Sequence, residues 1–233
     1  MSTERDVKVI KLFIMRIYLK TTPNKESVYF NYQPLLTGVL HKWLGENDIH
    51  GELALHSFSW LQGSKKINDT LEFKHGATFF ISFYDVTNIR QVIKNIRIDP
   101  ELFHGMIVKD IVIGDDPDLS NKENFMLGSP VFVRRSVEGK DIHYSYEDVN
   151  VGRLMEETLR NKMRKAGIPD DETLQIEFDL QYVGKKIKMV NYRNIRNKAN
   201  WCPLIIKGKP ETKLFAWNVG IGNSTGIGFG SIF

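Results

Sequence analysis

The order of strand-like and helix-like segments in the first 113 residues limits the fold more than any other feature. Apolar residues recur at helical spacing over residues 33–44 and 86–97, and Asn31 is placed to cap the first of these helices. Stretches rich in β-branched and aromatic residues predict strands at 7–19, 53–61, 71–84 and 103–113. The resulting order, β-α-β-β-α-β, is that of a ferredoxin-like domain.

The polar stretch 114–124 (GDDPDLSNKEN) predicts a domain boundary. We therefore expect an N-terminal domain over residues 1–120 and a C-terminal domain over 121–233. The second half shows a less regular βαβ-type pattern, with a strand in GSPVFVRR (128–135), a helix over 151–166 and strands near 174–183 and 201–219. The fold class is α+β.

Charge is distributed unevenly along the chain. The net charge is +4, yet residues 181–233 contain nine Lys and Arg residues and a single acidic residue, Glu211. Tyr, Trp and Asn residues are interleaved with these cations. Such a block favours a polyanion as partner, and nucleic acid fits better than a membrane surface because no basic amphipathic helix is evident there.

Several classes of protein are excluded by composition. Cys202 is the only cysteine, so neither an intrachain disulfide nor a thiolate zinc site is expected, and a cytoplasmic location is predicted. No apolar run approaches the roughly 18 residues of a membrane span. We expect no metal and no cofactor, since neither a metal-ligand cluster nor a phosphate loop before a helix occurs.

The chain closes with GIGNSTGIGFG, residues 220–230. A dinucleotide fingerprint requires a third glycine where Thr225 stands, and a helix after it. The remaining interpretation is a loop whose backbone passes close to a bulky charged group. Glycine permits that approach, and its N–H groups can hold phosphate oxygens.

This tail resembles the C-terminal glycine-rich signature of the CRISPR repeat-processing endoribonucleases, in the RAMP superfamily. Two Gly-hydrophobic-Gly units, at 220–222 and 228–230, are separated by five residues. The stretches YFNYQPLLTGVLHKWL (29–44) and GSPVFVRR also resemble that family. The resemblance implies two tandem ferredoxin-like domains. It also implies a metal-independent cut in each repeat of a precursor CRISPR RNA, in which the ribose 2′-OH attacks the adjacent phosphate and leaves 5′-OH and 2′,3′-cyclic phosphate ends.

Histidine is the natural acid–base residue for such a cut. Helical spacing turns His41 away from the stripe formed by Leu36, Leu40 and Trp43 and places it on one face with Thr37 and Gly38. The resemblance places the active site at this helix and the following loop, where His50 matches the family's loop histidine. We therefore expect His41 and His50 to be base and acid, in an order that the sequence leaves open. His56, Tyr29, Tyr32, Lys65 and Lys66 are weaker candidates.

RNA-binding residues are expected in the basic segment and in the tail. They are Lys185, Lys186, Lys188, Arg193, Arg196, Lys198, Gly220, Gly222, Gly228 and Gly230. Arg153, Arg160 and Arg164 are weaker candidates because their helix also carries acidic residues.

Alternative functions share the same fold. A non-catalytic RAMP-type subunit that holds guide RNA in an effector complex would keep the tail without needing a histidine on the first helix. A general ferredoxin-like RNA-binding module would show no preference for a repeat. The sequence does not distinguish a monomer from a homodimer or from a member of a CRISPR effector complex.

Overall fold

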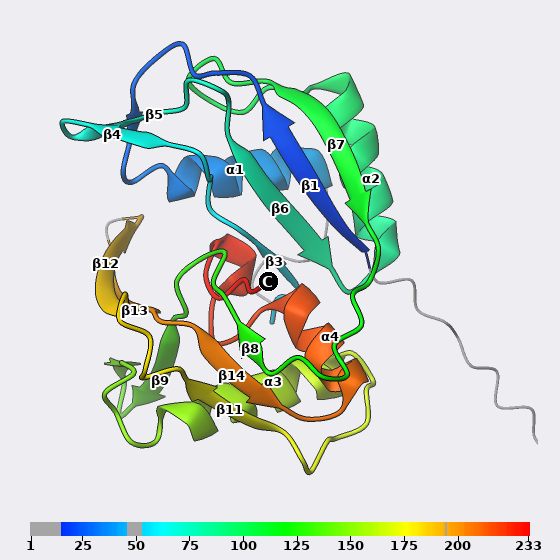
Figure 1. Ribbon diagram of the computed structural model, residues 1–233, viewed down its shortest axis with the longest axis vertical. Coiled ribbons are helices and arrows are strands. Elements are labelled where there is room, and N and C mark those ends of the chain that lie inside the picture. The colour runs from blue at the N-terminus through cyan, green and yellow to red at the C-terminus, as the bar shows by residue number, and fades with distance from the viewer. Residues whose placement is uncertain (1–14, 46–52, 194) are drawn as a thin grey trace, which may run out of the picture.

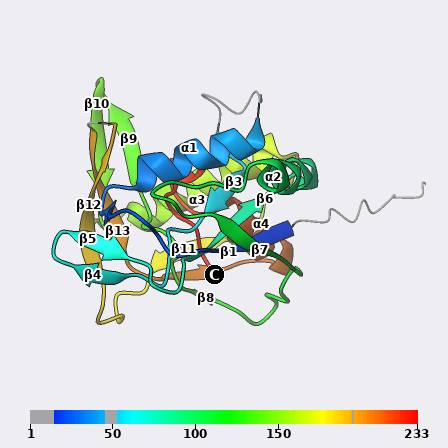
Figure 2. The ribbon, with the colours of Figure 1, turned by 90° about the horizontal axis from the view of Figure 1, so that it is seen from above.

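The computed structural model describes residues 15–45, 53–193 and 195–233, which form two packed halves (Figure 1). In the first half, β1 (Met15–Thr21), β3 (His56–Phe58), β6 (Thr78–Phe83) and β7 (Val108–Gly114) form an antiparallel sheet in the order β3-β6-β1-β7. The helices α1 (Gln33–Leu44) and α2 (Val86–Ile98) cover one face (Figure 2). This is the predicted ferredoxin-like order.

A smaller antiparallel sheet extends from the first half. It consists of β2 (Val28–Tyr29), β5 (Thr70–Glu72) and β4 (Lys65–Ile67). The hairpin formed by β4 and β5 turns at Asn68, whose φ is 52°.

The second half repeats the ferredoxin-like order. Its sheet has the order β11-β14-β8, from β11 (Gln175–Phe178), β14 (Leu204–Lys207) and β8 (Asn124–Phe125). The chain's last residues occupy the fourth position beside β8, where Leu127 pairs with Ile232 and the Phe233 N–H donates to the Met126 oxygen at 3.0 Å. The helices are α3 (Val151–Lys165) and α4 (Pro210–Val219). The glycine-rich tail thus connects α4 to the C-terminal residues that pair beside β8 at the edge of this sheet.

Two hairpins are inserted into this second unit. One is formed by β9 (Val133–Val137) and β10 (Lys140–Tyr144), and the other by β12 (Lys186–Tyr192) and β13 (Ile195–Trp201). The β12–β13 hairpin carries much of the basic segment and lies on the same side of the molecule as the smaller sheet of the first half, on the left in Figure 1.

Several sequence predictions need correction. The predicted strand at 201–219 was wrong beyond Lys207, because Pro210 begins α4, and nearly every side of that helix is buried, which hid its periodicity. Asn31 does not cap α1; the N-cap is Tyr32, without a side-chain cap bond. The strand expected at 128–135 begins only at Val133.

The two halves share an interior. The first hydrophobic core includes Phe132, Val190 and Phe229 from the second half. Arg16 of β1 is fully buried, its guanidinium lies between the Phe80 and Trp217 rings, and it donates to the Ile232 oxygen at 2.9 Å. Burial lowers the pKa of Arg16 to about 9.

In the part of the chain that the structure describes, no helix is long and apolar enough to cross a membrane.

Candidate functional site

One face of α1 packs against the glycine-rich loop. Gln33 Nε2 donates to the Ile227 oxygen at 2.6 Å, and Thr37, one turn later, is buried beside the same oxygen. His41 follows after another turn and is half-buried. The expectation that Thr37 and His41 share a face holds, but this face is not simply solvent-exposed, because the loop covers its first two turns. A Cβ added at Gly38 would have no atom within 4 Å, so open space remains beside this face of α1.

His56 of β3 is close enough to His41 for their charges to interact. It is 2% exposed and stacks on Phe83, with ring centroids 4.8 Å apart. Burial lowers the pKa of His56 to about 3, and the charges of His41 and Lys162 act in the same direction. His56 is therefore neutral at pH 7, which makes it a poor proton donor. Sequence spacing could not reveal this environment, since β3 is covered on both faces by segments distant in sequence.

Lys162 of α3 was not predicted as a functional residue. Its side chain is 1% exposed, and Nζ donates to the oxygens of Val219 and Gly220 and to Thr225 Oγ1 at 2.9–3.0 Å. It thereby fixes the start and middle of the glycine-rich loop. Burial lowers the pKa of Lys162 to about 7. The sequence did contain a signal for its burial, because Lys162 follows the inward-facing Met155 by seven residues, or about two helical turns.

The tail glycines are required by the protein's own backbone. The φ angles of Gly220, Gly222, Gly228 and Gly230 lie between 65° and 88°. A Cβ at Gly230 would lie 1.9 Å from the Ile221 oxygen, and one at Gly222 would lie 2.4 Å from the Phe132 oxygen. The N–H groups of Gly220, Gly228 and Gly230 donate to carbonyl oxygens of this chain. At these four glycines, the backbone that approaches closely is therefore that of the protein itself. RNA binding by these glycines stays a prediction.

A family described as "CRISPR associated protein Cas6, C-terminal" matches residues 115–232, just over half of the chain. The chain belongs to the Cas6 family. No curated protein matches it.

Solved structures support the fold of this Cas6-family chain. A structure described as a Cas6-related gene from Pyrococcus furiosus matches with a TM-score of 0.83 at 20% identity. Another, described as CRISPR associated protein Cas6, matches with 0.80 at 17% identity. A third, described as a RAMP protein binding different RNA substrates, gives 0.78 at 21%. Each alignment covers 94% of this chain and 98% of the other. The resemblance inferred from the tail is confirmed, as is the tandem ferredoxin-like fold.

The six basic residues predicted to bind RNA all lie on or beside the β12–β13 hairpin. Lys186, Arg193 and Arg196 are exposed. Among the described residues none of the six forms a salt bridge. By contrast, Arg153 forms a salt bridge with Glu157 and Arg160 forms one with Asp170. These ion pairs weaken the positive potential that the two arginines present to solvent.

The other predicted catalytic residue, His50, falls within residues 46–52, outside the described part of the chain. The structure therefore places His41 and leaves the His41–His50 pair a prediction. Within residues 15–45, 53–193 and 195–233, no group of three or more His, Cys, Asp and Glu side chains is arranged to hold a metal ion.

Proposed function

We propose that this Cas6-family protein is an endoribonuclease that cuts the repeats of a precursor CRISPR RNA. One observation carries the proposal: His41 stands on the α1 face that packs against the family's glycine-rich loop, beside an open position at Gly38. Among the structural matches, one is described as a Cas6 product complex, with a TM-score of 0.65.

The proposed reaction needs no metal ion. A base removes the proton of the ribose 2′-OH, the oxygen attacks the adjacent phosphorus, and an acid protonates the departing 5′ oxygen. The products are a 2′,3′-cyclic phosphate and a 5′-OH. We assign the two proton transfers to His41 and His50. His56 is buried and its pKa is lowered to about 3, so it is neutral at pH 7 and we assign no proton transfer to it.

RNA would approach from the side of the β12–β13 hairpin. Lys186, Arg193 and Arg196 offer exposed charges to phosphates. In the glycine-rich loop, Asn223, Ser224, Gly226 and Ile227 are partly exposed. Gly220, Gly222, Gly228 and Gly230 are buried and shape the loop from within.

The test is cleavage of a synthetic repeat RNA in EDTA by the wild type and by His41→Ala/His50→Ala. We expect the double variant to lose about 10²–10⁴-fold in rate while still binding RNA, because general acid–base catalysis is worth about that much. His75→Ala, at an exposed position, serves as the matched control and should cut normally.

The end groups decide the mechanism. Wild-type products should carry 5′-OH and cyclic-phosphate ends in EDTA. Undiminished cutting by the double variant would refute the assignment of the histidines, and dependence on a divalent ion would refute the metal-free reaction. RNA binding without any cutting by the wild type would favour the alternative, a RAMP-type subunit that holds guide RNA.

A further inference from the structure

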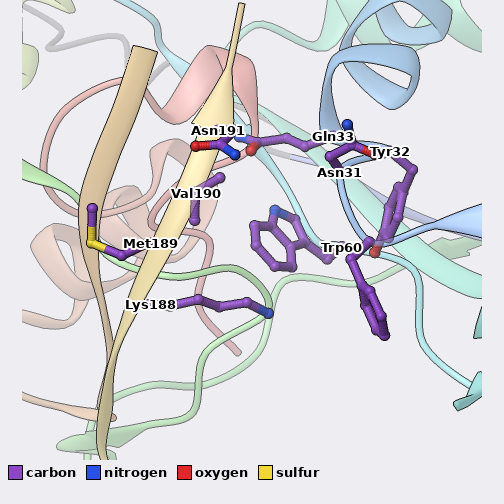
Figure 3. Close-up of a pocket in the computed structure, with 9 residues that line it drawn as sticks. Asn31, Tyr32, Gln33, Trp60, Lys188, Met189, Val190 and Asn191 are labelled. Atoms are coloured by element: carbon purple, nitrogen blue, oxygen red, sulfur yellow. The ribbon is translucent and has the colours of Figure 1, made fainter. Parts of the chain in front are cut away.

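A pocket separates the start of α1 from the β12–β13 hairpin. It is lined by residues 30–33, Trp60 and residues 188–191, and has a volume of about 230 Å³ (Figure 3). Its walls come from both halves of the molecule. It opens beside the exposed Phe30 and the basic hairpin, where the proposed RNA would pass.

Gln33 gives this pocket a fixed hydrogen-bond acceptor. The side chain is 3% exposed, and its Nε2 donates to the Ile227 carbonyl oxygen at 2.6 Å. A carbonyl oxygen only accepts, so the amide cannot be reversed. The Oε1 atom, which is buried, has no hydrogen-bond partner among the described residues. The side chain extends from α1 toward Asn191 of β12 (Figure 3). A buried acceptor without a partner is costly, and a ligand that donates to it would remove that cost.

The rest of the pocket suits a nucleotide. Trp60 is held in place because its Nε1 donates to the Gly228 oxygen at 2.7 Å. The ammonium of Lys188 lies 4.3 Å from the centre of the Trp60 ring, within a site that also contains the amides of Asn31 and Asn191. Phe30, half exposed at the rim, offers a ring on which a base can stack.

We propose that this pocket binds one unpaired nucleobase that carries an exocyclic amino group, such as adenine, with the amine donating to Gln33 Oε1. The inference rests on the proposed function for its ligand, RNA. Gln33 and His41 lie on the same face of α1, two turns and about 12 Å apart along the helix. The pocket would therefore read a base a short distance along the strand from the phosphate that is cut.

The test compares two RNA octamers that differ only in the amino group: oligo(adenosine) and oligo(purine riboside), each with a fluorescent end label. We expect the full-length wild type to bind the adenosine octamer about fivefold more tightly, the effect of one hydrogen bond to an otherwise unsatisfied acceptor. Gln33→Leu should bring the two affinities within about twofold. The matched control Gln91→Leu, at an exposed position of α2, should keep the preference.

Phe30→Ala should weaken both octamers by the same factor, since stacking does not involve the amino group. Equal affinities of the wild type for the two octamers would overturn the inference, whether or not Gln33→Leu folds. So would a preference that persists in a folded Gln33→Leu protein. If repeat RNA is cut while the octamers bind equally, only the base pocket is refuted. If the preference is present and no repeat RNA is cut, only the nuclease is refuted.

Discussion

At the scale of single residues, burial decides what each titratable group can do. His41 and His56 have the same side chain and neighbouring positions, but His41 is half-buried at an open face while His56 is 2% exposed. Desolvation disfavours the charged imidazolium, so the buried His56 ring stays neutral and contributes by packing. Lys162 is a second buried group whose pKa burial lowers, here to about 7, and its Nζ donates to three oxygens of the loop that it fixes.

The lowered pKa of His56 predicts a particular dependence of stability on pH. Between its ordinary value of 6.5 and its folded value of about 3, the unfolded chain binds a proton that the folded chain does not. Stability from this group is therefore present above pH 6.5 and is lost as the pH falls, by at most about 1.4 kcal/mol per pH unit.

His56→Phe, which keeps a ring against Phe83, should remove this dependence. The difference in free energy of unfolding between variant and wild type should be constant above pH 7.5 and shift in favour of the variant from pH 6 to pH 4. Urea unfolding at pH 4.5, 6 and 8 measures it. Parallel curves for the two proteins at all three pH values would contradict the burial argument.

At the scale of elements, the glycine-rich loop depends on a backbone that only glycine supplies. Gly230→Ala should cost more than about 3 kcal/mol, since its φ is 65° and a Cβ would lie 1.9 Å from the Ile221 oxygen. Gly38→Ala is the matched control: it is helical, has nothing within 4 Å and should stabilise by about 1 kcal/mol. Denaturant unfolding measures both, and a Gly230→Ala protein as stable as the wild type would show that the loop adjusts.

The elements also show where sequence patterns fail. The predictions for α1, α2 and α3 came close to the structure because each helix has one buried stripe and one exposed face. The same reasoning missed α4, where the residues from Phe215 to Val219 are all buried between the two halves. A helix covered on most sides has no periodic contrast between polar and apolar positions.

At the scale of the whole molecule, charge and packing separate the two tasks of the proposed enzyme. The acid–base candidates lie on the first half, and the uncompensated cations lie on a hairpin inserted into the second. The shared interior and the buried Arg16 join the halves, so RNA bound by the hairpin, as we propose, would be presented to the face of α1.

Replacing Lys186, Arg193 and Arg196 together by Ala should weaken RNA binding. The plot of log K against log salt should also become less steep, its negative slope shrinking in magnitude by about 2, since each lost phosphate contact removes about 0.7–0.9. Anisotropy titrations of repeat RNA from 50 to 300 mM salt measure the slope. Lys94→Ala/Arg97→Ala, exposed on α2, is the control and should leave the slope unchanged. An unchanged slope in the triple variant would place the RNA elsewhere.

The sequence by itself determined the ferredoxin-like order, the family and the basic character of one segment, because local periodicity, glycine spacing and charge are properties of neighbouring residues. Only the tertiary structure decided that His56 is buried near His41, that Lys162 fixes the loop and that Gln33 has an acceptor facing Asn191. These features arise where α1, β3, α3, β12 and the tail meet, and the free energy of burial at such a junction depends on segments that are far apart along the chain.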